Sequence, residues 1–362
     1  MIGKITSLVA VAALSATPLL GMAPAPISHA ATTIAGLNQV KVVASTIDSQ
    51  NGDLNPYGLT YDSYAGTNTS PNPFFGDFLV SNFSNSAGTS GTGDSIEAIN
   101  PKTGAVQPFS HYANGPVALA VSPKGPVWVA NFGQMGTDGN VEVLKPNGTL
   151  FPGSDSMITN ADLGGPWGQV FVPGTTPAFL VTNALTGTVD AMYDFSPPTF
   201  NTDTQFAVIG SGLAHQGTTA ATVQGPQGMV YDPMTHMIYV TDTADNSIRA
   251  FFWTGSTTPN QGTGQLVFQG APLAGPAGIT INPINGDLLV VNTRHNTLVE
   301  LTVGQNGTPA HVVAIRLLDK TPVNPQTGAG SALFGVYAMK NAQGQLRVYF
   351  TDDNTNTLDV LK

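Results

Sequence analysis

The sequence has no cysteine and few charged residues. None of its 362 residues is Cys, and 9% are charged, against a usual share of about 25%. The absence of Cys excludes disulfides, thiolate catalysis and covalent c-type haem attachment. Twelve basic residues face 22 acidic ones, giving a formal net charge of -10. We therefore expect no nucleic-acid partner, because such proteins carry a basic surface.

The low carboxylate content also bears on the medium in which the protein works. Acid unfolds most proteins by protonating carboxylates that are paired or hydrogen-bonded in the native state. A chain with few carboxylates has little such stability to lose. We therefore expect tolerance of an acidic medium.

The first thirty residues have the pattern of a secretory signal peptide. Lys4 precedes an apolar run over residues 5–22, and Ser28-His29-Ala30 offers small residues before a cut at Ala30/Ala31. No later stretch approaches the roughly twenty apolar residues of a spanning helix. The sequence predicts a protein that is secreted or periplasmic, monomeric, and without a membrane segment after cleavage. One domain is expected over residues 31–362.

A unit of three short strands recurs along the chain. In residues 225–253, Gly-Pro opens the unit, and apolar runs are separated by turn residues such as Asp232-Pro233 and Asn246. Five further copies follow the same order, and their equivalent prolines lie 50 to 60 residues apart at Pro56, Pro116, Pro166, Pro226 and Pro276. One unit cannot bury both faces of its sheet, so a repeat of this length predicts a propeller.

A fourth strand is expected between successive copies. Candidate strands are residues 106–109, 205–209, 265–268 and 311–317, and the last copy ends after its third strand. Residues 39–44 near the N-terminus form an unassigned strand. We predict that this strand completes the sixth blade and closes the ring, which leaves no open edge. The alternative is a loose N-terminal arm.

The copies resemble the NHL repeat, which has a Pro-x-Gly start, a strand ending in V-x-D and an N-x-I third strand. Residues 225–253 and 275–303 match best, and the resemblance extends over residues 45–362. It implies an all-β, six-bladed propeller with four-stranded blades and the first strand innermost. Gluconolactonase-like and strictosidine-synthase-like propellers are more loosely related. The fold alone implies little chemistry, because it carries enzymes and binding proteins alike.

Candidate binding residues fall on the face that carries the longer loops, where propellers usually bind ligands. These rim candidates precede or follow the inner strands, and they are Tyr57, Trp167, Gln227, Phe334, His111, His215, Arg294 and His295. Aromatic rings beside Asn and Gln suit a protein, peptide or glycan better than an anionic ligand. We therefore predict a non-catalytic binding or scaffold module, with no cofactor.

The alternative is a metal-dependent enzyme that resembles lactonases or lyases. Six strand ends carry oxygen ligands, and Asp242 and Asp352 are the strongest candidates to hold Ca²⁺ or another divalent ion. Asp and Asn at such a point more often bond the next turn, which favours a structural role. The related lactonases and amidating lyases place metal ligands after the conserved Pro. Here that position holds Tyr57, Val117, Trp167, Gln227, Ala277 and Phe334, and none is a good ligand.

Overall fold

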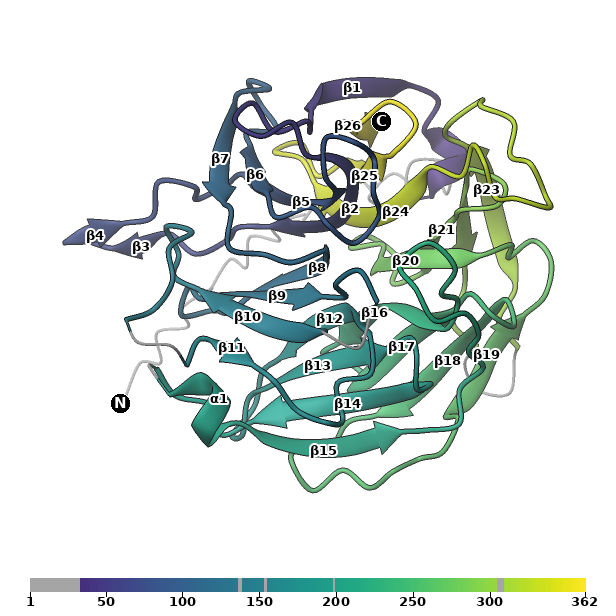
Figure 1. Ribbon diagram of the computed structural model, residues 1–362. Coiled ribbons are helices and arrows are strands. Elements are labelled where there is room, and N and C mark those ends of the chain that lie inside the picture. Colours follow the sequence, from purple (N-terminus) through teal and green to yellow (C-terminus); the bar gives the residue numbers. More distant parts are fainter. Residues whose placement is uncertain (1–32, 136–138, 153–154, 198, 305–308) are drawn as a thin grey trace, which may run out of the picture.

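Six antiparallel sheets stand in a ring around a central channel (Figure 1). A computed structural model describes residues 33–135, 139–152, 155–197, 199–304 and 309–362, so the predicted signal peptide lies outside the described residues. Each sheet has four strands, and the first strands of successive blades contact one another in a closed circle. The predicted six-bladed, all-β propeller with the first strand innermost is confirmed. No helix in the described part has the length and apolar character to cross a membrane.

The blades follow one another along the chain, and within each blade the strands are ordered from the channel outward. Blade 1 contains β2 (Leu54–Tyr61), β5 (Phe78–Ser84), β6 (Ile96–Ile99) and β7 (Val106–Ser110). Blade 2 contains β8 (Pro116–Val121), β9 (Val127–Asn131), β10 (Asn140–Leu144) and β11 (Met157–Ile158). Blade 3 contains β12 (Pro166–Val172), β13 (Ala178–Asn183), β14 (Thr188–Tyr193) and β15 (Gln205–Gly210). Blade 4 contains β16 (Pro226–Asp232), β17 (Met237–Asp242), β18 (Ser247–Phe252) and β19 (Gln265–Gln269). Blade 5 contains β20 (Pro276–Ile281), β21 (Leu288–Asn292), β22 (Thr297–Leu301) and β23 (Val312–Leu317). Blade 6 contains β24 (Leu333–Lys340), β25 (Leu346–Asp352), β26 (Thr357–Leu361) and β1 (Val40–Ser45).

Five small elements were not predicted from the sequence. Strand β11 is two residues long, too short to leave a pattern of its own. The others are the hairpin β3 (Gly66–Thr67) and β4 (Ser70–Pro71), the 3-10 turn η2 (Ile34–Gly36) and the single-turn helix α1 (Phe200–Asp203).

The N-terminal strand closes the ring, as predicted. Strand β1 pairs antiparallel with β26, from Val40 opposite Leu361 to Ser45 opposite Thr357. The segment before it is fastened to blade 5, because Ile34 N–H donates to Glu300 Oε2 at 2.7 Å and Arg316 Nε donates to Ile34 O at 2.9 Å. Chain ends far apart in sequence therefore share blade 6.

The Pro-x-Gly signature lies at a bulge in the innermost strand. The first strand of each blade loses register over two or three residues, starting at the conserved Pro in blades 1 to 5 and at Leu333 in blade 6. The glycine after this point touches the next blade: a Cβ at Gly168 would overlap the Gln227 carbonyl, and one at Gly335 would lie 2.6 Å from the Tyr57 carbonyl oxygen. Glycine allows the backbones to meet directly at this position in five blades, whereas Ala118 holds it in blade 2.

A hydroxyl group joins neighbouring blades at the same level. Gly168 N–H donates to Thr182 Oγ1 at 2.7 Å, and that hydroxyl donates to the carbonyl of Gln227 in the next blade at 2.7 Å. Thr241, Thr351 and Ser81 bridge in the same way, each between the inner glycine of its blade and a carbonyl of the following blade. Ala130 and Val291 occupy the equivalent position in blades 2 and 5.

The hydrophobic core lies between adjacent blades. One cluster joins blades 3 and 4 through Leu180, Val240 and Phe251, and another joins blades 2 and 3. In the second cluster Trp128 stacks on Phe179 at 4.0 Å between ring centroids. Because each blade buries both faces against its neighbours, stability depends on the ring being complete.

Ring closure predicts a large effect of removing β1. Deleting residues 1–45 should lower the melting temperature by about 10 °C or more, because β26 loses its partner strand and exposes an edge. Deleting residues 1–30 is the control and should leave the melting temperature unchanged. An unchanged value for the longer deletion, measured by calorimetry, would show that β1 is a dispensable arm.

The bridging hydroxyl predicts a cost for T182V. This near-isosteric change leaves the buried Gly168 N–H and Gln227 carbonyl without their partner, so the free energy of unfolding should fall by about 1–3 kcal/mol. V291T adds a hydroxyl at the equivalent place in blade 5 and should not lower stability. Urea unfolding of both variants checks this, and equal losses would contradict it.

Candidate functional site

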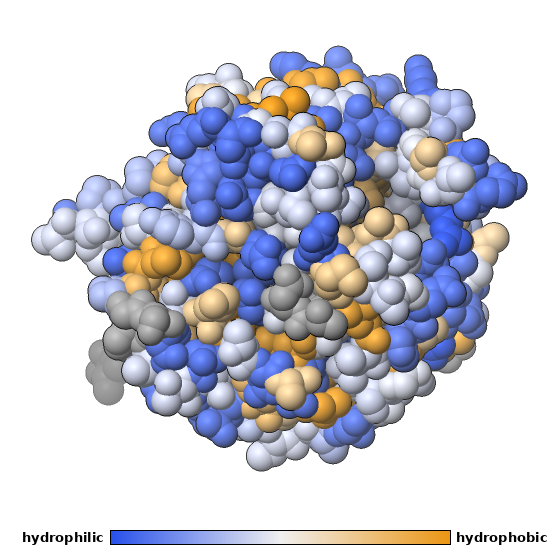
Figure 2. Space-filling model, in the orientation of Figure 1, coloured by the Kyte–Doolittle hydropathy of each residue, from blue (hydrophilic) through white to orange (hydrophobic). Residues whose placement is uncertain are grey.

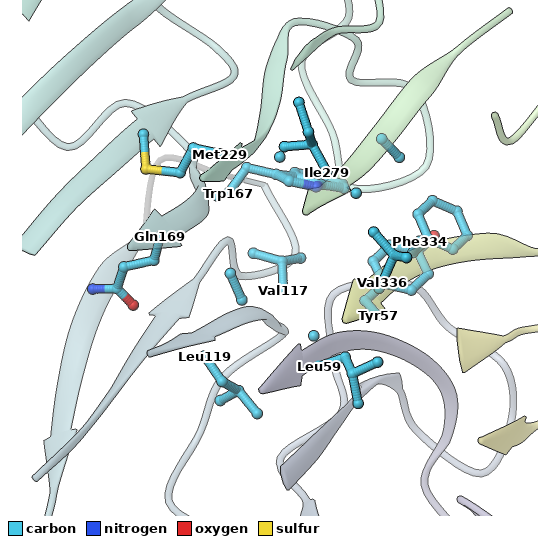
Figure 3. A pocket seen from close by; sticks show the side chains of 17 residues that line it. Tyr57, Leu59, Val117, Leu119, Trp167, Gln169, Met229, Ile279, Phe334 and Val336 are labelled. Carbon is cyan, nitrogen blue, oxygen red and sulfur yellow. The ribbon is translucent and has the colours of Figure 1, made fainter. Parts of the chain in front are cut away.

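The central channel is too narrow for a ligand. Its cavity measures about 90 Å³ and is lined by the bulge region of all six inner strands. Figure 3 shows Leu59, Val117 and Leu119 beside it, with Gln169 among the labelled side chains. Ligand pockets usually measure about 300–1,000 Å³, so this space suits a few water molecules.

An aromatic cluster closes one end of the channel. Tyr57 is stacked between Phe334, at 3.7 Å between centroids, and Phe83, at 4.4 Å. Trp167 packs against Tyr57, Phe83 and Phe132, and it is 7% exposed. We call these five residues the aromatic plug. Figure 3 shows Tyr57 and Phe334 lying against each other beside the channel.

A larger pocket lies above the aromatic plug. This mouth pocket has a volume of about 560 Å³, and its floor includes Tyr57, Trp167 and Phe334. Half of its lining residues carry an aliphatic hydroxyl or a side-chain amide; these are Asn55, Ser90, Thr222, Gln224, Gln227, Thr243, Thr293, Asn324, Gln326, Thr327 and Ser331. Among the described residues that line it, Arg294 is the one cation and Asp353 the one carboxylate. The pocket is therefore polar and nearly neutral, and the face seen in Figure 2 likewise mixes hydrophilic and hydrophobic residues.

Two internally bonded loops form walls of the mouth pocket. Gln216 and Gln224 exchange both backbone hydrogen bonds at 2.8 Å, and their side chains bond at 2.7 Å. In the other loop, Asn324 Oδ1 accepts from the N–H groups of Gln326 and Thr327. Buried Asn296 then donates to Gly330 O at 2.7 Å. Loops held by their own bonds present a preformed site.

Asp353, Asn55 and Tyr57 form a polar group at the edge of the floor. The Asn55 amide is oriented to donate to the Asp353 carboxylate and to accept from Ser84 Oγ at 2.9 Å. Asn55 has a left-handed backbone (φ 72°), an unusual conformation that is tolerated by Asn. Burial, with the nearby charge of Asp352, raises the pKa of Asp353 to about 7. Burial and the Asp353 charge also raise the pKa of Tyr57.

The structure brings five of the eight rim candidates together. Tyr57, Trp167, Gln227, Arg294 and Phe334 line the mouth pocket, and Gln227 Oε1 is buried there without a hydrogen-bond partner.

The three histidines among the rim candidates do not line the mouth pocket. His111 Nε2 lies 2.8 Å from Asp48 Oδ2, His215 Nδ1 bonds Leu213 O, and His295 is exposed.

The strand-end residues make local hydrogen bonds. Asp242 Oδ1 accepts from Ala244 N–H at 2.9 Å, and Asp352 Oδ1 accepts from Thr355 N–H at 3.1 Å. Asn292 similarly accepts from Ala274 N–H and donates to Pro272 O. In the described part of the chain, no three His, Cys, Asp or Glu side chains gather in a way that could hold a metal ion. Among the described residues, Asp242 and Asp352 therefore belong to no such group.

Sequence reasoning missed Asn55, Asp353 and the loop residues of the mouth pocket. Asp353 directly follows a strand end, and the other blades have at this position Phe83, Phe132, Ala184, Thr243 and Thr293. That position varies in chemistry while its neighbour stays Asn or Asp. This variable position next to a constant one was the available signal, because it marks a place where the fold does not require one particular side chain.

Comparison with known proteins supports the fold and goes no further. No family model and no curated protein matches the chain. Among solved structures, a putative oxidoreductase (glucose dehydrogenase) from Thermus thermophilus is 14% identical, with a TM-score of 0.54 over 90% of this chain and 99% of that one. An auxiliary nutrient binding protein from Bacteroides thetaiotaomicron is 11% identical, with a TM-score of 0.55 over 89% and 76%. These likenesses show a six-bladed propeller, and membership of the NHL family stays a prediction.

The burial of Trp167 predicts that W167A is a stability variant. Removing a ring that packs on three other aromatics should lower the free energy of unfolding by about 3–5 kcal/mol. Chemical denaturation measures this. R294A, at an exposed side chain of the same pocket, is the control and should change stability by less than about 0.5 kcal/mol. A loss below about 1 kcal/mol for W167A would mean that Trp167 is a surface residue.

Proposed function

We propose that the chain is a non-catalytic binding module that holds a neutral, hydroxyl-rich ligand, such as the end of a glycan, in the mouth pocket. The observation that carries this is the set of hydroxyl and amide side chains around an aromatic floor. Hydroxyl and amide groups both donate and accept hydrogen bonds. Sugar hydroxyls do the same, so such a lining matches them without needing charge.

The dimensions of the mouth pocket agree with a ligand of this class. Its volume of about 560 Å³ lies within the range of small-ligand pockets. Phe334 is partly exposed and offers apolar surface for the C–H face of a sugar ring. The unpartnered Gln227 Oε1 is an acceptor that a ligand hydroxyl could satisfy. A solved propeller of similar fold is named as a nutrient binding protein, which is consistent with a binding role.

The metal-dependent enzyme has less support. It needs ligands at the channel, yet the inner position after the conserved Pro carries aromatic, apolar or amide side chains. The strand-end carboxylates Asp242 and Asp352 are engaged by turn N–H groups. We further propose that the protein acts outside the cytoplasm as a monomer, on the basis of the signal-peptide pattern and a ring without an open blade edge at its closure.

Calorimetric titration with a panel of soluble neutral oligosaccharides tests the proposal. We expect one class to bind, and Q227A to weaken that binding roughly tenfold, the value of one hydrogen bond of about 1.4 kcal/mol. Q265A, at an exposed Gln on the outer strand β19, is the matched control and should bind as the unchanged protein does.

Two results would contradict the proposed function. Hydrolysis of a lactone panel that a chelator abolishes would establish the enzyme. Binding of peptides with no response to any oligosaccharide would replace the ligand class.

A further inference from the structure

Four blades carry an acidic residue at one repeat position of the third strand. We call these residues the third-strand acids, and they are Glu97, Glu142, Asp190 and Asp359. Each one pairs with the residue of the second strand that lies two positions before the Asn or Asp at the end of that strand. Arg249 and Val299 hold the position in blades 4 and 5. The four side chains are buried, with 1%, 6%, 1% and 5% of their surface exposed. Acidic residues are rarely this buried without a partner.

Each third-strand acid has one carboxyl oxygen without a hydrogen-bond partner. The atoms are Glu97 Oε1, Glu142 Oε1, Asp190 Oδ1 and Asp359 Oδ1. Glu300, one position further along β22, is a useful contrast. It is fully buried, but its oxygens accept from Ile34 N–H, Asn282 and Asn285. A buried carboxylate is normally solvated by donors at both oxygens, as Glu300 is. Each third-strand acid has donors at no more than one oxygen; in Asp190 this is Oδ2, which accepts from Asn183 and Thr188.

The charged groups around the third-strand acids do not neutralise them. Asp48 and Asp53 face Glu97, and the His111 imidazole bonds Asp48. Asp162 faces Asp190, and Asp352 with Asp319 faces Asp359. Glu142 meets the Ser156 hydroxyl and the Val143 N–H. In the described residues no ion pair involves any of the four.

We propose that the third-strand acids adapt this propeller to an acidic medium: the native ring holds them as neutral carboxylic acids and loses stability when they ionise. A neutral carboxyl can sit between packed blades at modest cost. An ionised one would be a buried, unpaired charge beside other carboxylates, which is strongly unfavourable. Because four blades carry such an acid, the loss of stability on ionisation occurs at four places in the ring.

The direction of the pH dependence follows from proton linkage. Burial, and after it the neighbouring Asp48, raises the pKa of Glu97 to about 9. Burial also raises the pKa of Asp190 to about 7 and the pKa of Asp359 to about 6. The pKa of Glu142 is raised by burial as well. The unfolded chain releases these protons near pH ~4, so the native state binds more protons above that pH. Stability is therefore greatest near pH ~4 and falls as the pH rises through the raised values. Asp48, with a pKa lowered to about 2, loses its contribution only below this range.

Thermal unfolding between pH 4 and pH 9 tests the proposal. We expect the melting temperature of the unchanged protein to be on the order of 10 °C higher at pH 4.5 than at pH 8. D190N, which cannot ionise, should reduce this difference. D194N is the matched control, because it removes one charge from an exposed residue just after β14 and should leave the difference intact.

Every outcome of the pH series decides the question. A melting temperature that is lower at pH 4.5 than at pH 8 overturns the proposal, whatever the variants do. A rise towards acid that E97Q, E142Q, D190N and D359N all leave unchanged would assign the effect to groups other than the third-strand acids, and would also overturn the proposal. If D190N does not fold, the other three variants supply the comparison.

Discussion

The direct contact between innermost strands is the constraint on which the rest of the propeller depends. Gly168 and Gly228 each lie against a carbonyl of the next blade, and hydroxyls such as Thr182 bridge the same gap. This contact draws six blades together until the channel encloses only about 90 Å³. Leu59 and Leu119 are among the side chains that line this narrow space, and the aromatic plug closes one end of it. The room for a ligand therefore lies above the plug, in the mouth pocket.

The repeat pattern was sufficient to predict the architecture. Proline spacing, strand ends and the unassigned strand near the N-terminus led to six blades and the correct closure, because each is a local signal repeated in register. Strand β11 was missed since two residues carry no period. The site was harder to predict: Asn55 and Asp353 lie near opposite ends of the chain and meet only because blade 6 closes onto blade 1. Trp167 was predicted at the rim, and its burial depends on neighbours that no single repeat contains.

Equivalent positions have taken different roles in different blades, and this asymmetry produces the site. The residue after the strand end is Phe in blades 1 and 2, where it belongs to the aromatic plug. In blades 4 and 5 it is Thr, which bonds Gly225 or Gly275. In blade 6 it is Asp353, in the wall of the mouth pocket. A symmetric ring would have the same residue at this position in all six blades. In this ring the position is apolar in blades 1 and 2 and polar in blades 4 to 6.

Burial without a neighbouring cation raises the pKa of Asp353 in the mouth pocket, as it does for the third-strand acids. Asp353 is surrounded by an aromatic ring, an amide and another carboxylate, and its pKa of about 7 has the same cause as the raised values between the blades. In an acidic medium Asp353 is neutral and can donate a hydrogen bond as well as accept one. The pocket then offers hydroxyl, amide and carboxylic acid groups, all suited to an uncharged polar ligand. The medium that favours the scaffold thus also favours the proposed class of ligand.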